Sequence, residues 1–160
     1  MNDRIVVLEI SHLEALHLAG LVGQFADLVG STRETEDPAV ARLLPDAYPD
    51  DPEASREFRR LTGDDMLARR AEDARTLLST LATDGVAVDP DSDADTTIAV
   101  ALSELEAMAW MRTLSAVRLV LAERLGIQDE DDHRPDDPRF GIYDWVGYRL
   151  DGLVQALDAR

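Results

Sequence analysis

The chain has 160 residues, of which 45% are hydrophobic, so it is long enough to bury one core and short for two. Its formal net charge is −17, with 33 Asp and Glu against 16 basic residues, and a surface this acidic repels a phosphate backbone. We therefore expect a single domain over residues 1–160 that does not bind nucleic acid directly.

The absence of cysteine excludes disulfides, thiol nucleophiles and thiolate metal ligands. Every basic residue is Arg, since the chain contains no Lys. No apolar run approaches the roughly 20 residues that a membrane helix needs, and the first residues lack the basic leader of a signal peptide. We expect a cytoplasmic protein that does not enter a membrane.

Two stretches share a local pattern, residues 7–16 and residues 99–108. Each has a short β-prone run followed by Ser-x-Leu-Glu-Ala and an apolar helical face. Both serines fit a capping box, so each should mark a strand-to-helix junction. We expect residues 5–10 and 98–102 to pair as a two-stranded ribbon; the alternative is that two common capping boxes match by chance.

Helical periodicity predicts the rest of the fold. The expected helices cover residues 12–29, 38–44, 53–61, 64–81, 104–125 and 142–158. The segment Thr62-Gly-Asp-Asp65 is expected to end one helix and cap the next. The helix over residues 104–125 is apolar around much of its circumference and should lie at the centre of a mainly α-helical bundle. The expected inward-facing residues include Leu13, Phe25, Leu105, Met108, Tyr148 and Leu153.

Arg112 and Arg118 interrupt this central helix. A buried Arg needs a carboxylate or several carbonyl partners, and Asp144 and Asp151 of the last helix are the candidates. We interpret the arrangement as an ion pair that locks the last helix on the core. A recognition site is the alternative.

Two patterns resemble metal sites, and both are incomplete. Asp89-x-Asp91-x-Asp93 is spaced like a calcium loop, but Ala94 and Val100 stand where an EF-hand needs Gly and Glu. Glu14 and His17 resemble half of a di-iron carboxylate motif, which needs a second Glu-x-x-His on another helix; the other two such spacings, Glu9/His12 and Glu130/His133, do not lie within an expected helix. We therefore assign no metal ligand and no cofactor.

Catalytic motifs are absent from the sequence. It has no Gly-x-Ser-x-Gly nucleophile elbow and no Gly-rich phosphate loop. We assign no catalytic residue and expect a protein that is not an enzyme. The alternative is a small-molecule or metal-binding sensor or enzyme with a pocket between the central and C-terminal helices. A homodimer built on exposed apolar helix faces is a further alternative.

Arginines cluster in one part of this acidic chain, which favours contact with a protein partner through that part. The candidate docking residues are Arg56, Arg59, Arg60, Arg69 and Arg70, with Arg42 nearby in the sequence. We expect charge reversal at Arg59 and Arg60 to weaken capture of the partner without changing the fold.

Five motifs occur in order along most of the chain and together resemble one protein family. They are Leu43-Leu-Pro-Asp-Ala-Tyr48, Glu57-Phe-Arg-Arg-Leu-Thr-Gly-Asp-Asp-Met66, Ala109-Trp-Met-Arg-Thr-Leu114, Arg118-Leu-Val-Leu-Ala-Glu-Arg-Leu-Gly-Ile127, and Tyr143-Asp-Trp-Val146 followed by Leu153-Val-Gln-Ala-Leu157. The combination resembles the actinobacterial AosR-like family, formerly a domain of unknown function and later described as oxidative-stress transcriptional regulators. The resemblance implies a small helical regulator that contacts the transcription machinery, with a sigma factor or RNA polymerase as partner.

The chain departs from this family in one respect. The redox-sensing version of the role uses two cysteines three residues apart, and this chain has none. It therefore regulates without sensing, takes its signal from a partner, or belongs to cysteine-free members that are not regulators. No catalytic or binding residue carries over from the family.

Overall fold

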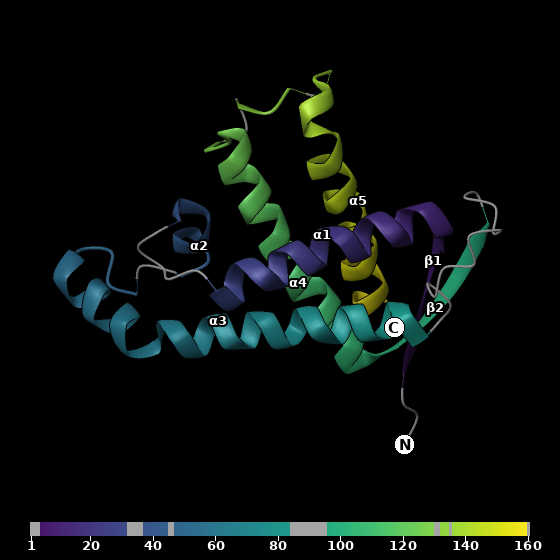
Figure 1. Ribbon diagram of the computed structural model, residues 1–160, viewed down its shortest axis with the longest axis horizontal. Coiled ribbons are helices and arrows are strands. Elements are labelled where there is room, and N and C mark those ends of the chain that lie inside the picture. Colours follow the sequence, from purple (N-terminus) through teal and green to yellow (C-terminus); the bar gives the residue numbers. More distant parts are fainter. Residues whose placement is uncertain are drawn as a thin grey trace.

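The computed structural model describes residues 4–31, 37–44, 47–83, 96–129, 132–134 and 136–159, and every structural statement below concerns these residues. In chain order the elements are β1 (Ile5–Ser11), α1 (His12–Ser31), α2 (Pro38–Arg42), α3 (Pro52–Thr83), β2 (Thr97–Ser103), α4 (Glu104–Leu125), η2 (Pro138–Phe140) and α5 (Gly141–Asp158). The fold is mainly α-helical with a small antiparallel sheet, which confirms the predicted class (Figure 1).

The predicted ribbon is present. β1 and β2 pair antiparallel, from Ile5 opposite Ser103 to Ser11 opposite Thr97. One face of the ribbon is buried against the helices, because side chains alternate between the two faces of a strand. Both serines end a strand and begin a helix, and Ser103 forms a complete capping box with Glu106.

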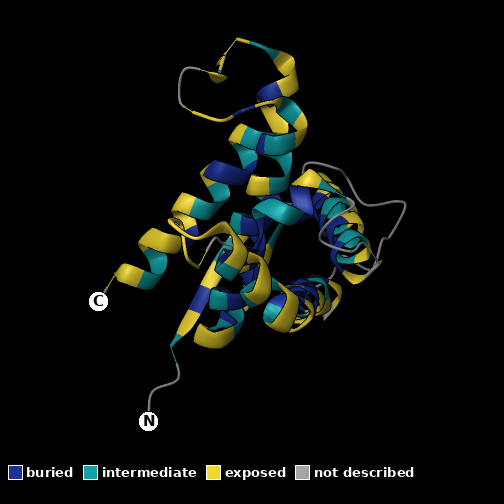
Figure 2. Ribbon diagram, turned by 90° about the vertical axis from the view of Figure 1, so that its left-hand side faces the viewer, coloured by how far each residue is buried: buried dark blue, intermediate teal, exposed yellow. Residues whose placement is uncertain are grey.

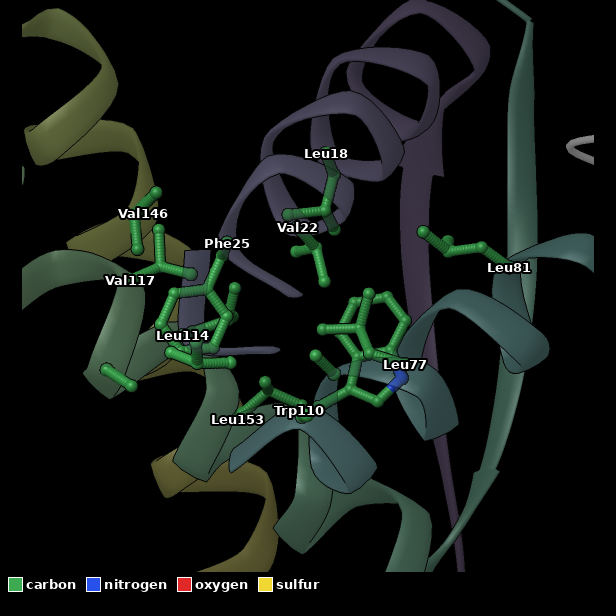
Figure 3. Close-up of a cluster of buried hydrophobic side chains, with 14 of the residues drawn as sticks. Leu18, Val22, Phe25, Leu77, Leu81, Trp110, Leu114, Val117, Val146 and Leu153 are labelled. Carbon is green, nitrogen blue, oxygen red and sulfur yellow. The ribbon is translucent and has the colours of Figure 1, made fainter. Parts of the chain in front are cut away.

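The core lies between α1, α3, α4 and α5. α3 packs against α1 and α4, and α4 packs against α5 (Figure 1). Figure 3 shows side chains from all four helices meeting around Trp110, which is 1% exposed. The labelled residues in that cluster are Leu18, Val22, Phe25, Leu77, Leu81, Trp110, Leu114, Val117, Val146 and Leu153.

The break predicted between the helices over residues 53–61 and 64–81 is wrong, because residues 52–83 form one helix of 32 residues. The Thr62 hydroxyl donates to the Phe58 carbonyl oxygen at 2.8 Å, within the same helix, instead of capping a new one. The buried residues Gly63, Leu67 and Ala74 then lie within about 40° of one another on one side of the helix. The N-terminal part of α3 extends beyond the end of α1 (Figure 1).

Three of the expected inward-facing residues point outward. Leu13, Leu105 and Tyr148 are 44%, 78% and 69% exposed, whereas Phe25 and Leu153 are buried as predicted. Neighbouring helices and strands cover only part of the circumference of most helices. An apolar residue is buried only where such a neighbour packs against it. Figure 2 shows the outcome, with buried residues on the inward sides of the helices and exposed residues on the outward sides.

Two arginines hold α5 against the rest of the molecule. Arg4 donates to the Leu157 carbonyl oxygen at 2.7 Å and also to the carbonyls of Ala156 and Ala159, so it caps the C-terminal end of α5. Arg149 donates to the backbone oxygen of Glu9 in β1 at 3.0 Å. These contacts fix the position of α5 and therefore the pocket between α5 and α4.

Candidate functional site

The five candidate docking arginines all lie on α3. At 3.6 residues per turn, Arg59 and Arg70 fall within about 20° of one another, and Arg56 and Arg60 lie about 60° and about 100° from Arg59 on the same side. Arg69 lies about 100° around the helix from Arg70. The five arginines therefore spread over roughly half of the circumference of α3.

These arginines differ in exposure and in partners. Arg56, Arg60 and Arg69 are exposed, whereas Arg59 and Arg70 are half-buried. Arg60 forms an ion pair with Glu57 at 2.6 Å, and both side chains are more than half exposed. Such an exposed pair contributes little to stability.

Arg42 is not part of this group. It lies on α2 and contacts Glu123 of α4 at 3.4 Å and the Ile127 carbonyl oxygen at 3.1 Å. Proximity in the sequence suggested a shared surface, but α2 directs Arg42 toward α4.

Two exposed apolar side chains lie in or beside the protruding part of α3. Leu61 is 65% exposed and Tyr48 is 51% exposed. Tyr48 is held in place, since its ring packs edge-on against Phe58 and its backbone N–H and C=O both bond the hydroxyl of Ser55. We define the α3 docking surface as Tyr48, Arg56, Arg59, Arg60, Leu61, Arg69 and Arg70.

A pocket of about 780 Å³ lies between α4 and α5, at the end where the two helices are joined by η2 and the preceding loop. The alternative pocket of the sequence analysis was expected between these two helices, and two residues singled out there, Arg118 and Asp144, line it. The lining residues are Arg42, Ser115, Arg118, Leu119, Ala122, Ile127, Gln128, Asp129, His133, Tyr143, Asp144 and Leu150.

The ion pairs predicted for the central helix are wrong. Arg112 pairs with Asp73 of α3 at 2.9 Å, because that part of α4 faces α3. Asp144 pairs with His133, with 2.6 Å between Nε2 and Oδ1. Arg118 has no ion pair among the described residues, and its Nε is buried without a hydrogen-bond partner.

Arg118 is nevertheless fixed in position. Its guanidinium carbon lies 4.4 Å from the centre of the Tyr143 ring, a cation–π distance. A Cβ at Gly147 would come within 3.2 Å of the guanidinium, so glycine provides the space that Arg118 occupies. The pocket thus contains one positioned cation, Arg118, that forms no ion pair with the described residues.

A separate polar cluster joins α1 to α5. The Glu14 carboxylate accepts hydrogen bonds from Trp145 at 2.8 Å and from Arg149 at 2.6 Å. Burial raises the pKa of Glu14, but the bonds from Arg149 and Trp145 outweigh it and hold that pKa below its ordinary value. Glu14 is therefore an anion that links α1 to α5.

The structure adds two observations on metal and membrane binding. Across the described part of the chain, no three His, Cys, Asp or Glu side chains are grouped so that they could hold a metal ion. The calcium-like segment around Asp91 lies outside the described residues. Every helix within the described ranges is too short or too polar to cross a lipid bilayer.

Comparison with known proteins identifies the family. The chain is 29% identical over 148 residues to a Mycobacterium leprae (strain TN) protein named "Putative oxidative stress regulator AosR". The match covers 81% of this chain and 63% of that relative, so the chain spans less than two thirds of the relative's length. No solved structure matches the chain. A model of the family described as "Domain of unknown function (DUF2017)" matches residues 1–157, and the chain belongs to this family.

Proposed function

We propose that this protein is a cytoplasmic, non-enzymatic regulator of the oxidative-stress response that acts by contact with another protein. Membership of the DUF2017 family and the similarity to the Mycobacterium leprae protein support a regulatory role. The partner in this proposal belongs to the transcription machinery, as a sigma factor or RNA polymerase.

The α3 docking surface is the observation that carries the proposal. Its arginines lie on a helix that extends beyond its neighbours (Figure 1), and Tyr48 and Leu61 are exposed in the same part of the molecule. Arg and Tyr are the residue types that most often dominate binding energy at protein interfaces. Acidic residues lie between the arginines in the sequence, namely Glu57, Asp64 and Asp65. The surface therefore carries positive and negative charges and suits a partner whose surface also carries charges of both signs.

The lack of cysteine determines how such a regulator receives its signal. Without a thiol, this chain cannot form the disulfide that a cysteine-based sensor uses. In our proposal the partner senses the oxidant. Treating this protein alone with oxidant therefore does not change its affinity for the partner.

Affinity capture from a lysate of the source organism, with and without oxidant, tests the proposal. We expect a sigma factor or RNA polymerase subunit to be recovered by the wild-type protein and lost with Arg56→Glu/Arg60→Glu. The matched control is Arg75→Glu/Arg134→Glu, which changes the net charge equally at exposed arginines outside the surface. Equal recovery by both variants would contradict the docking surface, and recovery of the tagged protein without any partner would contradict the proposal.

A further inference from the structure

Arg118 is unusual among the arginines of α4. Acidic residues outnumber arginines 33 to 16 in this chain, and the other two arginines of α4 each have a carboxylate partner. Arg112 pairs with Asp73, and Arg124 pairs with Asp37 at 2.6 Å. Arg118 has no such partner within the described residues, although carboxylates are plentiful in the chain.

Leaving Arg118 in this state costs free energy. Its Nε is buried without an acceptor, and a buried donor without a partner loses its hydration with no compensation. The Tyr143 ring and the space above Gly147 hold the guanidinium where it lines the pocket. A cation that is positioned but unpaired in a pocket is arranged to bind an anion.

The charged neighbours of Arg118 limit the charge of that anion. Asp144 contacts His133, and Arg42 contacts Glu123 and donates a hydrogen bond to the Ile127 carbonyl oxygen. Asp129 also lines the pocket. Two carboxylates in the wall and a formal net charge of −17 disfavour a multiply charged ligand, so a single negative charge fits best.

The remaining walls indicate what accompanies the charge. Leu119, Ala122 and Leu150 supply apolar surface from both helices, and Ser115 supplies one hydroxyl. The volume of about 780 Å³ falls within the range of small-molecule sites. The pocket therefore offers one cation at a defined place and an apolar surface beside it.

We propose that the α4–α5 pocket binds a small organic monocarboxylate with an apolar body, with Arg118 as the carboxylate partner. The apolar body lies against Leu119 and Leu150. This site is separate from the α3 docking surface, and either can exist without the other. A ligand here bridges α4 and α5 and stabilises their packing by mass action.

NMR titration of the ¹⁵N-labelled full chain tests the site with sodium acetate, butanoate and hexanoate as probes. We expect affinity to rise roughly tenfold from butanoate to hexanoate, as two further CH₂ groups are buried. The Arg118 Nε–H signal should shift on binding. Hexanamide, which has no charge, and inorganic phosphate should bind at least roughly tenfold more weakly than hexanoate.

Variants separate this site from non-specific binding. Arg118→Met should abolish hexanoate binding and Arg118→Lys should weaken it, whereas Arg112→Met on the same helix should leave it unchanged. Leu119→Trp fills the pocket without removing Arg118 and should also block binding, which decides the question if Arg118→Met does not fold. Failure of hexanoate to bind, equal binding of hexanamide, tighter binding of phosphate, or unchanged affinity in a folded Arg118→Met would each overturn the proposal.

Discussion

The indole nitrogen of Trp110 in α4 donates a hydrogen bond to the hydroxyl of Thr80 in α3 at 2.8 Å, and both side chains are buried. The Thr80 hydroxyl in turn donates to the Leu77 carbonyl oxygen at 2.7 Å. This arrangement satisfies the one polar atom of the largest side chain in the core (Figure 3). It also fixes the position of α4 on α3.

Thr80→Val should destabilise the protein by about 1–3 kcal/mol, because it leaves the buried indole N–H without an acceptor. Thr80→Ser, which keeps the hydroxyl, should cost less. Chemical denaturation of both variants measures the difference. Trp110→Phe removes the indole N–H, so Thr80→Val should reduce the free energy of unfolding by less in that background. An equal reduction in both backgrounds would show that the Trp110–Thr80 hydrogen bond does not contribute to stability.

Glu14→Gln should reduce the free energy of unfolding by about 1–2 kcal/mol at neutral pH, since it weakens charge-assisted bonds that are partly exposed to solvent. Glu72→Gln is the control, because Glu72 is exposed on α3. Denaturation at pH 7 compares the two variants. Equal effects of the two substitutions would contradict the α1–α5 link.

The same link has a defined pH dependence. The pKa of Glu14 is lowered in the fold, so its stabilisation is complete above the ordinary value of 4.5 and is lost as the pH falls through the lower, folded value. The stability difference between wild type and Glu14→Gln should therefore shrink as the pH falls below 4.5. Protonation of the other carboxylates also reduces charge repulsion at low pH. This effect is the same in both proteins, so it cancels in the difference between them. A difference that grows at low pH would show that the pKa is raised instead.

Two glycines of α5 should respond differently to alanine. Gly152→Ala should stabilise the protein by up to about 1 kcal/mol, because a Cβ at that exposed helical position meets open space. Gly147→Ala should gain less or lose stability, because its Cβ would lie 3.2 Å from the Arg118 guanidinium. Thermal unfolding of the two variants measures this directly. Equal stabilisation would mean that Arg118 is free to move away.

The continuity of α3 can be measured with spin labels, because the chain has no native cysteine. Labels at Glu53→Cys and Arg75→Cys, both exposed positions, should give one backbone separation of about 33 Å for a continuous helix at 1.5 Å per residue. A helix that ends at Thr62 and restarts at Asp64 would give a shorter and broader distribution.

Local signals in the sequence predicted much of the fold. The two Ser-x-x-Glu patterns located both strand-to-helix junctions, because a capping box involves only residues close in the chain. The ribbon followed from the same pattern. The apparent break at Thr62 was misread, since the hydroxyl that can cap a new helix can equally bond the carbonyl four residues earlier.

Tertiary contacts were harder to predict. The partner of Arg112 was expected on the last helix, but the observed partner Asp73 lies 39 residues away on α3, and no local pattern links the two. The alternative pocket was expected between α4 and α5, yet nothing in the sequence indicates that His133 and Asp144 in its lining contact each other. That pairing joins a loop to a helix and has no periodic signature in the sequence.

The regulatory role is tested most directly by deleting the gene in the source organism and sequencing transcripts before and after oxidant exposure. The account predicts that oxidant-response transcripts change on deletion, return to normal with the wild-type gene, and do not return with Arg56→Glu/Arg60→Glu at equal protein level. An unchanged oxidant response in the deletion strain would contradict it.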